Sequence, residues 1–221
     1  MPPTTARIIS IDRPTRKRYY DVTLDRGDVV KLSPEVLAQT ALRPGQELSE
    51  DQLRDVQERE ARYRAVTGAL RLLAYRQRSE KEIRDALRRR STPEDVIEET
   101  IARLQSAKFI DDAAFAGNYV EARDQASPRG RRLLAAELAA KGIGKPEREQ
   151  SLSSVDETGA AYRAAQKRAR SLASAAFPDF QRRLGDYLLR RGFNYETARR
   201  TVRQIWPETR PDHPSDPLGD D

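Results

Sequence analysis

The chain has no cysteine and only one histidine, one methionine and one tryptophan among its 221 residues. Without thiols it can form neither a disulfide framework nor a thiolate metal site, which is typical of a protein in the reducing cytoplasm. The first residues lack the basic-then-apolar order of a signal peptide, and no hydrophobic run approaches membrane-spanning length. We therefore expect a cytoplasmic protein with no membrane partner.

The chain also lacks the common catalytic motifs: it contains no P-loop, no dinucleotide-binding glycine pattern, no nucleophile elbow and no metal-ligand spacing. The single histidine, His213, lies in a polar, proline-rich tail that is typical of disorder. Asp111 and Asp112 are adjacent, but no further oxygen ligands accompany them, so we expect one of them to cap a helix rather than bind a metal. The sequence predicts a protein that is not an enzyme and holds no metal.

Positive charge is abundant and is concentrated in two blocks. The net charge is +5 over residues 62–110 and +6 over residues 156–206, whereas residues 207–221 carry −4. Of the 41 basic residues, 34 are arginine. Arginine suits bidentate contacts with phosphate and carboxylate, although a GC-rich genome would produce the same bias. The two blocks favour an anionic partner, either nucleic acid or an acidic protein surface.

The first part of the chain has the pattern of strands. Residues 7–12, 18–24 and 29–32 are rich in β-branched and aromatic types, and residues 25–28 form a turn between two of them. Ser33 and Pro34 then predict the start of a short helix, which should end at residues 43–46. We expect a small β-hairpin region here.

The remainder is predicted to be helical and internally repeated. A helix is expected over residues 50–76, with Ser49 as its cap and Val56, Tyr63 and Leu70 at heptad spacing. Beyond it, apolar pairs recur at steps of 51 and then 50 residues. The first set is Ile83 and Leu87, Leu134 and Leu138, and Leu184 and Leu188; the second is Ile101 and Leu104, Leu152 and Val155, and Val202 and Ile205.

Helix start and stop signals agree with this period. Proline stands where helices can begin, at Pro93, Pro128 and Pro178, and Gly142 and Gly192 stand where helices should end. Pro207 is expected to close the last helix. Three short helices cannot bury their apolar faces alone, so the repeats should share a core.

The sequence thus predicts a mainly α protein, with three tandem three-helix repeats in an elongated curved array behind the β-hairpin region. Its parts would be residues 1–48 (β-hairpin region with a short helix), 49–110 (long helix and first repeat), 111–155 (second repeat), 156–206 (third repeat) and 207–221 (disordered acidic tail).

The basic residues divide into two kinds. Arg90, Lys141 and Arg191 continue the apolar stripe of their helices, where a cation offsets the partial negative charge of the helix end and its alkyl stem covers apolar neighbours. We interpret these three as structural. Other arginines lie off the stripe and either form a solvated face or contact phosphate or an acidic partner. These candidate partner- or DNA-binding residues are Arg88, Arg89, Arg131, Arg132, Arg182, Arg183, Arg190, Arg199, Arg200 and Arg203.

Three segments resemble the bacterial RecX regulatory proteins: SEKEIRDAL, KFIDDAAFAGNYV and GRRLLAAELAAKGI. Their order and spacing match that family across residues 63–155, and the third repeat and the N-terminal region fit more loosely. The match departs at Ser91 and Thr92, where a glycine turn is expected. The resemblance implies a modulator of the RecA recombinase that needs no cofactor, and we expect this chain to be a monomer. Such a protein binds the RecA filament on single-stranded DNA, lies in its groove, and inhibits strand exchange, ATPase and coprotease activities.

Two other functions stay open at this point. Helix pairs joined near Arg90, Gly142 and Gly192 resemble helix-turn-helix units, which would make the chain a direct DNA-binding protein without a recombinase partner. Against sequence-specific reading of bases, residues 93–99 (PEDVIEE) are acidic where a recognition helix would begin. A scaffold that binds acidic proteins unrelated to recombination is the third possibility.

Overall fold

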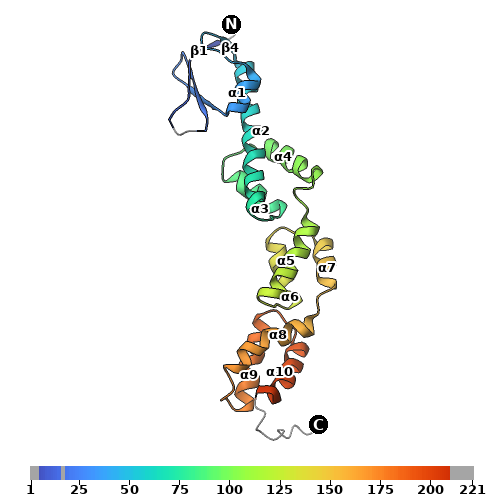
Figure 1. Cartoon of the computed structure of the whole chain (residues 1–221). Coiled ribbons are helices and arrows are strands. Elements are labelled where there is room, and N and C mark those ends of the chain that lie inside the picture. The colour runs from blue at the N-terminus through green and yellow to red at the C-terminus, as the bar shows by residue number, and fades with distance from the viewer. Residues whose placement is uncertain (1–4, 16–17, 210–221) are drawn as a thin grey trace. The chain divides into compact units, whose positions relative to one another are not determined.

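The structure is a computed structural model that describes residues 5–15 and 18–209. Within those ranges the chain forms four strands and ten helices, which confirms the mainly α class. It divides into two compact units, and the break falls between Ile110 and Asp111, except that Ser79–Lys81 group with the second unit. Figure 1 shows the elements of both units.

The first unit begins with an antiparallel sheet in the order β3-β2-β1-β4. The predicted strands appear as β1 (Thr5–Asp12), β2 (Tyr20–Leu24) and β3 (Val29–Leu32). Alternate residues of these strands, such as Ile8 and Leu24, turn one face into a small core. The fourth strand, β4 (Glu47–Ser49), pairs with β1 and was not predicted.

Two helices follow where the capping signals predict them. α1 (Pro34–Thr40) begins at Ser33, whose side chain accepts a hydrogen bond from Val36 N. α2 (Glu50–Tyr75) begins with a capping box between Ser49 and Gln52 and runs unbroken for 26 residues. Figure 1 shows α2 passing from the sheet to the helices of the first repeat.

The first repeat is completed by α3 (Glu80–Arg88) and α4 (Glu94–Ser106). Ile83 and Leu87 of α3 and Ile101 and Leu104 of α4 are at most 2% exposed. They pack with Ala65 and Ala69 of α2 in one cluster. The predicted apolar pairs therefore form the core of this repeat.

The second unit holds the other two repeats. One consists of α5 (Asp112–Ala126), α6 (Arg131–Ala140) and α7 (Lys145–Ser153), and the next of α8 (Glu157–Arg170), α9 (Phe177–Arg190) and α10 (Tyr195–Thr209). The predicted pairs on α6 and α9 are buried, as are Leu152, Val202 and Ile205. Val155 is only partly buried against the α5–α7 core.

The helix ends confirm two predictions and correct one. Gly142 and Gly192 lie two residues after the last residues of α6 and α9 and have positive φ angles of 83° and 85°. Pro207 does not close the last helix, because α10 continues through it to Thr209. Residues 207–209 are thus helical rather than part of the predicted tail, and the rest of that tail, including His213, lies outside the described residues.

None of the described helices is long and apolar enough to cross a membrane. Over the same residues, no group of three or more histidine, cysteine, aspartate or glutamate side chains is arranged to hold a metal ion.

Candidate partner-binding surfaces

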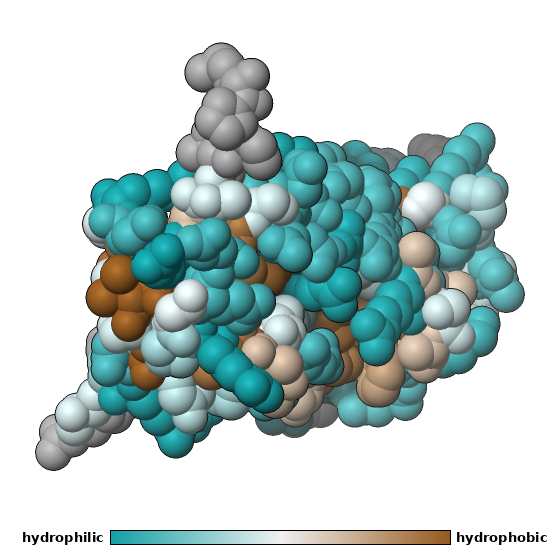
Figure 2. All heavy atoms as spheres, turned by 90° about the horizontal axis from the view of Figure 1, so that it is seen from above, coloured by the Kyte–Doolittle hydropathy of each residue, from teal (hydrophilic) through white to brown (hydrophobic). Residues whose placement is uncertain are grey.

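All ten arginines predicted to bind a partner are exposed. Their helices bury the opposite stripe, as the spacing predicts. Figure 2 shows one face of the molecule, which is mostly hydrophilic with interrupted apolar patches. Exposure makes a contact with an anionic partner possible, and the local bonds of each arginine determine how available it is.

Arg88 is engaged with the start of α4. Its Nε donates to Glu94 Oε2 at 3.1 Å, and its second guanidinium nitrogen donates to the other oxygen of the same carboxylate. This bidentate contact lowers the pKa of Glu94. Both side chains are about half exposed, so the pair is worth little in water. An anion that binds Arg88 has to displace Glu94, whereas Arg89 lies just beyond the end of α3.

Arg131 and Arg132 open α6 and contact backbone carbonyls. Arg131 donates to Val155 O at 2.7 Å, and Arg132 donates to Leu189 O at 3.2 Å. The Arg131 guanidinium therefore links the start of α6 to the end of its own repeat, and the Arg132 guanidinium links it to α9 of the following repeat. These two arginines have a structural role in addition to any contact with a partner.

The largest set of predicted arginines lies on α9 and α10, which we call the α9/α10 arginine set: Arg182, Arg183, Arg190, Arg199, Arg200 and Arg203. The structure brings Arg182 and Arg199 together in a groove of about 320 Å³ between the two helices, and Tyr195 lines the same groove. Tyr195 is 68% exposed. A groove with two cations and an exposed ring can hold an anionic group beside a flat one.

Within the same helices, only two members of this set form ion pairs. Arg182 contacts Asp179 at 3.0 Å and Arg200 contacts Glu196 at 2.9 Å. All four side chains are more than half exposed. Exposed pairs three or four residues apart contribute only about 0.3–0.5 kcal/mol. Such pairs do not prevent these arginines from binding phosphate or an acidic surface.

The three cations predicted to be structural behave in two ways. Lys141 Nζ lies 5.7 Å and 5.4 Å from the ring centres of Phe115 and Tyr119. Arg191 lies over the ring of Tyr187 and donates to Ser127 Oγ at 2.9 Å. Both side chains contact neighbouring groups within the second unit, which fits their interpretation as structural.

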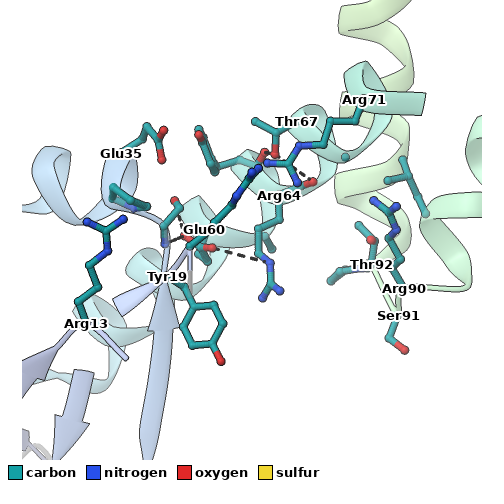
Figure 3. A pocket seen from close by; sticks show the side chains of 18 residues that line it. Arg13, Tyr19, Glu35, Glu60, Arg64, Thr67, Arg71, Arg90, Ser91 and Thr92 are labelled. Carbon is teal, nitrogen blue, oxygen red and sulfur yellow. Dashed lines mark hydrogen bonds and ion pairs between the residues drawn. The ribbon is translucent and has the colours of Figure 1, made fainter. Parts of the chain in front are cut away.

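Arg90 is exposed and differs from these two. Its guanidinium lies where a side chain at position 68 would be, above Gly68 of α2. It lines a basic cleft of about 820 Å³ in the first unit, which is shown in Figure 3. The sequence did not predict this cleft. Its arginines come from three separate segments, and only the tertiary packing brings them together.

The paired aspartates have capping and bonding roles. Asp111 caps α5 by accepting a hydrogen bond from Ala114 N at 2.9 Å, as predicted. Asp112 accepts a hydrogen bond from Glu80 N at 2.8 Å. Trp206 packs edge-on against Phe177 and Phe180.

Comparison with known families gives three adjoining matches. The models of the first, second and third three-helix domains of RecX match residues 65–104, 111–152 and 156–202. These are the three repeats predicted from the sequence and found in the structure.

Curated relatives agree over most of the chain. Regulatory protein RecX of Geobacillus thermodenitrificans is 32% identical over 197 residues, which cover 85% of this chain and 72% of the relative. Regulatory protein RecX of Lacticaseibacillus paracasei is 27% identical over 216 residues, which cover 96% and 90%.

Two crystal structures have a similar fold. One, of regulatory protein RecX, has a TM-score of 0.55 at 25% identity and covers 93% of this chain and 94% of that one. The other, of RecX from Lactobacillus salivarius, has a TM-score of 0.60 at 27% identity and covers 67% and 97%.

Proposed function

This chain belongs to the RecX family of regulatory proteins, and on that premise we propose that it binds the RecA filament on single-stranded DNA and inhibits the filament's recombinase, ATPase and coprotease activities. RecA as the target follows from the family resemblance. The protein acts by binding, without a cofactor and without catalysing a reaction itself. Its described residues carry no arrangement typical of a metal site.

The observation that carries the proposal is the α9/α10 arginine set. Its six members are exposed, and Arg183, Arg190 and Arg203 form no ion pair with any residue that the structure describes. A filament on DNA presents phosphate and acidic protein groups, and exposed guanidinium groups bind both. The apolar stripes of the same helices are occupied by the core. The outer arginines are therefore available for a partner.

Inhibition follows when the protein binds an inactive state of the filament more tightly than the active state. A regulator that binds one state of the filament shifts the filament toward that state by the difference in affinity between the states. Contacts made through arginine weaken as salt rises, because exposed charges are screened over about 8 Å at physiological ionic strength. We therefore expect inhibition of the ATPase to decrease as salt is added.

The experiment is a titration of the protein into RecA bound to a single-stranded oligonucleotide, with the same oligonucleotide without RecA as the control. The readouts are light scattering or anisotropy for binding and phosphate release for the ATPase. Saturable binding to the filament with loss of ATPase activity, at concentrations where the naked strand is largely unbound, supports the proposal. Equal binding to the naked strand without any effect on the ATPase would indicate a plain DNA-binding protein.

Direct reading of base sequence has less support. α4, which would be the recognition helix of the first repeat, carries Glu94 and Asp95 in its first turn. Recognition helices contact bases through their N-terminal residues, and carboxylates there repel the phosphates on either side. We therefore propose contacts to phosphate and protein rather than to base edges.

A further inference from the structure

The basic cleft of the first unit is bounded on three sides. The loop after β1 supplies Arg13, Arg18 and Tyr19, α2 supplies Arg64 and Arg71, and the turn between α3 and α4 supplies Arg90. Figure 3 shows the labelled side chains around the opening. Five arginines and two carboxylates line a volume of about 820 Å³, which is comparable with the pockets of small ligands.

Both carboxylates of the cleft are bonded within the protein. Glu60 is only 6% exposed and accepts hydrogen bonds from Ser33 N and Ser33 Oγ, each at 2.8 Å. Glu35 lies near the Tyr63 hydroxyl; burial, and secondly the interaction with this carboxylate, raise the pKa of that phenol. The carboxylates are therefore used in holding α1 against α2, and positive charge is left in excess at the opening.

The arginines are less constrained. Arg64 lies 3.8 Å from Glu60 in a loose ion pair. Arg71 and Arg90 pair with no carboxylate among the residues that the structure describes. Gly68 leaves room for the Arg90 guanidinium, because any Cβ at that position would meet it. Two guanidinium groups thus line the cleft without a hydrogen bond to any residue in the described ranges.

The spacing of the cations points to more than one anionic group. Arg64 and Arg71 are seven residues apart on α2, which places them on one face about 10 Å apart along the helix axis. Thr67 lies between them, and Ser91 and Thr92 lie at the opposite side of the cleft. Cations spaced along a helix in this way can each contact a separate phosphate of a strand.

We propose that this cleft binds the phosphate backbone of single-stranded nucleic acid, with Arg64, Arg71 and Arg90 as the phosphate ligands and Tyr19 as the ring nearest the bases. A basic groove combined with aromatic side chains is typical of single-strand binding. The cleft is too small for a duplex. A strand also suits the cleft better than an acidic peptide, because each nucleotide carries a phosphate, whereas alternate side chains of an extended peptide point in opposite directions.

The test is anisotropy of a labelled oligothymidylate with the full chain and no recombinase present. We expect Arg64→Glu together with Arg71→Glu to weaken binding at least tenfold. The slope of log affinity against log salt should fall by about 1.4, since each phosphate contact on a single strand contributes about 0.7. The measurement is repeated with Arg199→Glu, Arg200→Glu and Arg203→Glu also present, so that DNA bound on α10 cannot mask the loss.

The matched control is Arg54→Glu together with Arg59→Glu. These arginines lie on the same helix, are exposed and do not line the cleft, and the change in net charge is the same. We expect this control to stay within twofold of its parent chain. Equal losses for the two pairs, or no loss for the cleft pair, would overturn the proposal. So would displacement of the oligonucleotide by polyglutamate at the same concentration of charges.

A second variant, Arg90→Gln, separates ligand binding from a structural role. It keeps most of the side-chain stem and removes the charge. We expect weaker binding of the oligonucleotide with an unchanged melting temperature. A lower melting temperature with unchanged affinity would show that Arg90 stabilises the end of its helix and does not bind the oligonucleotide. Because no recombinase is present, failure here leaves the filament assay of the proposed function unaffected.

Discussion

At the scale of the residue, one turn position recurs in all three repeats. Ser91, Gly142 and Gly192 are related by the repeat steps and all have positive φ angles, of 56°, 83° and 85°. A Cβ on Gly142 would meet the side chain of Lys81, and one on Gly192 would meet Leu133. In the first repeat the turn lines the open cleft instead, and a serine fits there. The departure from the expected glycine at this position thus has a structural explanation.

Ser91→Gly should therefore stabilise the protein. The left-handed conformation costs a residue with a Cβ roughly 1–2 kcal/mol, and the greater freedom of glycine in the unfolded chain offsets part of that gain. We expect a net increase of about 0.5–1 kcal/mol in the free energy of unfolding, measured by urea denaturation. Thr92→Gly is the control: Thr92 has no positive φ, so glycine there should destabilise. Destabilisation by both changes would contradict this account of the turn.

Asp112 gives a prediction for the dependence of stability on pH. Its pKa is raised above the ordinary value of 3.8, mainly by burial, although the hydrogen bond from Glu80 N acts in the opposite direction. The folded state therefore holds the proton more tightly than the unfolded state. The contribution of this group is most favourable below its unfolded pKa and is lost as the pH rises through the folded value.

Asp112→Asn removes this titration and keeps an acceptor for Glu80 N. The variant should be more stable than the wild type at pH 7, and the two should converge near pH 3, where Asp112 is protonated in both states. Urea unfolding at the two pH values measures the difference. A variant that is less stable at pH 7 would show that the carboxylate charge is favourable at the start of α5.

At the scale of the element, the contact between the second and third repeats depends on close approach of backbone. Gly130 N donates to Arg191 O at 2.9 Å, and a Cβ at Gly130 would collide with the backbone of Gly192 and Phe193. Arg191 reinforces the contact by donating to Ser127 Oγ and Pro128 O, at 2.9 Å and 3.1 Å. This contact cannot widen without breaking these bonds.

Gly130→Ala should destabilise the protein by about 2 kcal/mol or more, since the collision is with backbone and overpacking typically costs about 1–3 kcal/mol. Gly117→Ala is the matched control. A Cβ at Gly117 meets nothing within 4 Å, and alanine in a helix is favoured over glycine by up to about 1 kcal/mol. Thermal melts of both variants should therefore shift in opposite directions. A neutral Gly130→Ala would mean that the repeats are less tightly joined.

The sequence predicted the elements whose signals are local. Strand alternation, the caps at Ser33 and Ser49 and the repeated apolar pairs all depend on neighbouring residues. The heptad spacing predicted the buried residues of α2 less accurately. Tyr63 and Leu70 are only partly buried, whereas Ala65, Gly68 and Ala69 form the buried stripe of that part of α2. Small residues allow the other helices of the repeat to pack closely, and a heptad pattern of large residues does not reveal this.

The sequence did not predict the features that depend on tertiary contacts. α10 continues through Pro207 because Trp206 packs on Phe177 and Phe180, and Tyr162 donates a hydrogen bond to Glu208 in the following turn. Helical spacing predicted that the α9/α10 arginine set is exposed. It could not predict the basic cleft, which requires that three distant segments fold against one another.

At the scale of the whole molecule, the two basic blocks of the sequence fall in different units. The block with net charge +5 lies at residues 62–110 and the block with +6 at residues 156–206, on either side of the break at Ile110. Each block has its own exposed arginines and its own cavity. If both surfaces bind anions as proposed, they can act together, because binding at one raises the effective concentration at the other. Added salt should weaken anion binding at both surfaces.

The measurement that tests the central claim most directly is RecA ATPase inhibition by the variant with Arg199→Glu, Arg200→Glu and Arg203→Glu. The three residues are exposed on α10, and surface changes usually alter stability within about 0.5 kcal/mol each, so the melting curve should stay close to that of the wild type. Inhibition should be lost or shifted to at least tenfold higher protein concentration. Full inhibition by the folded variant at wild-type concentrations would contradict the assignment of these arginines to partner binding.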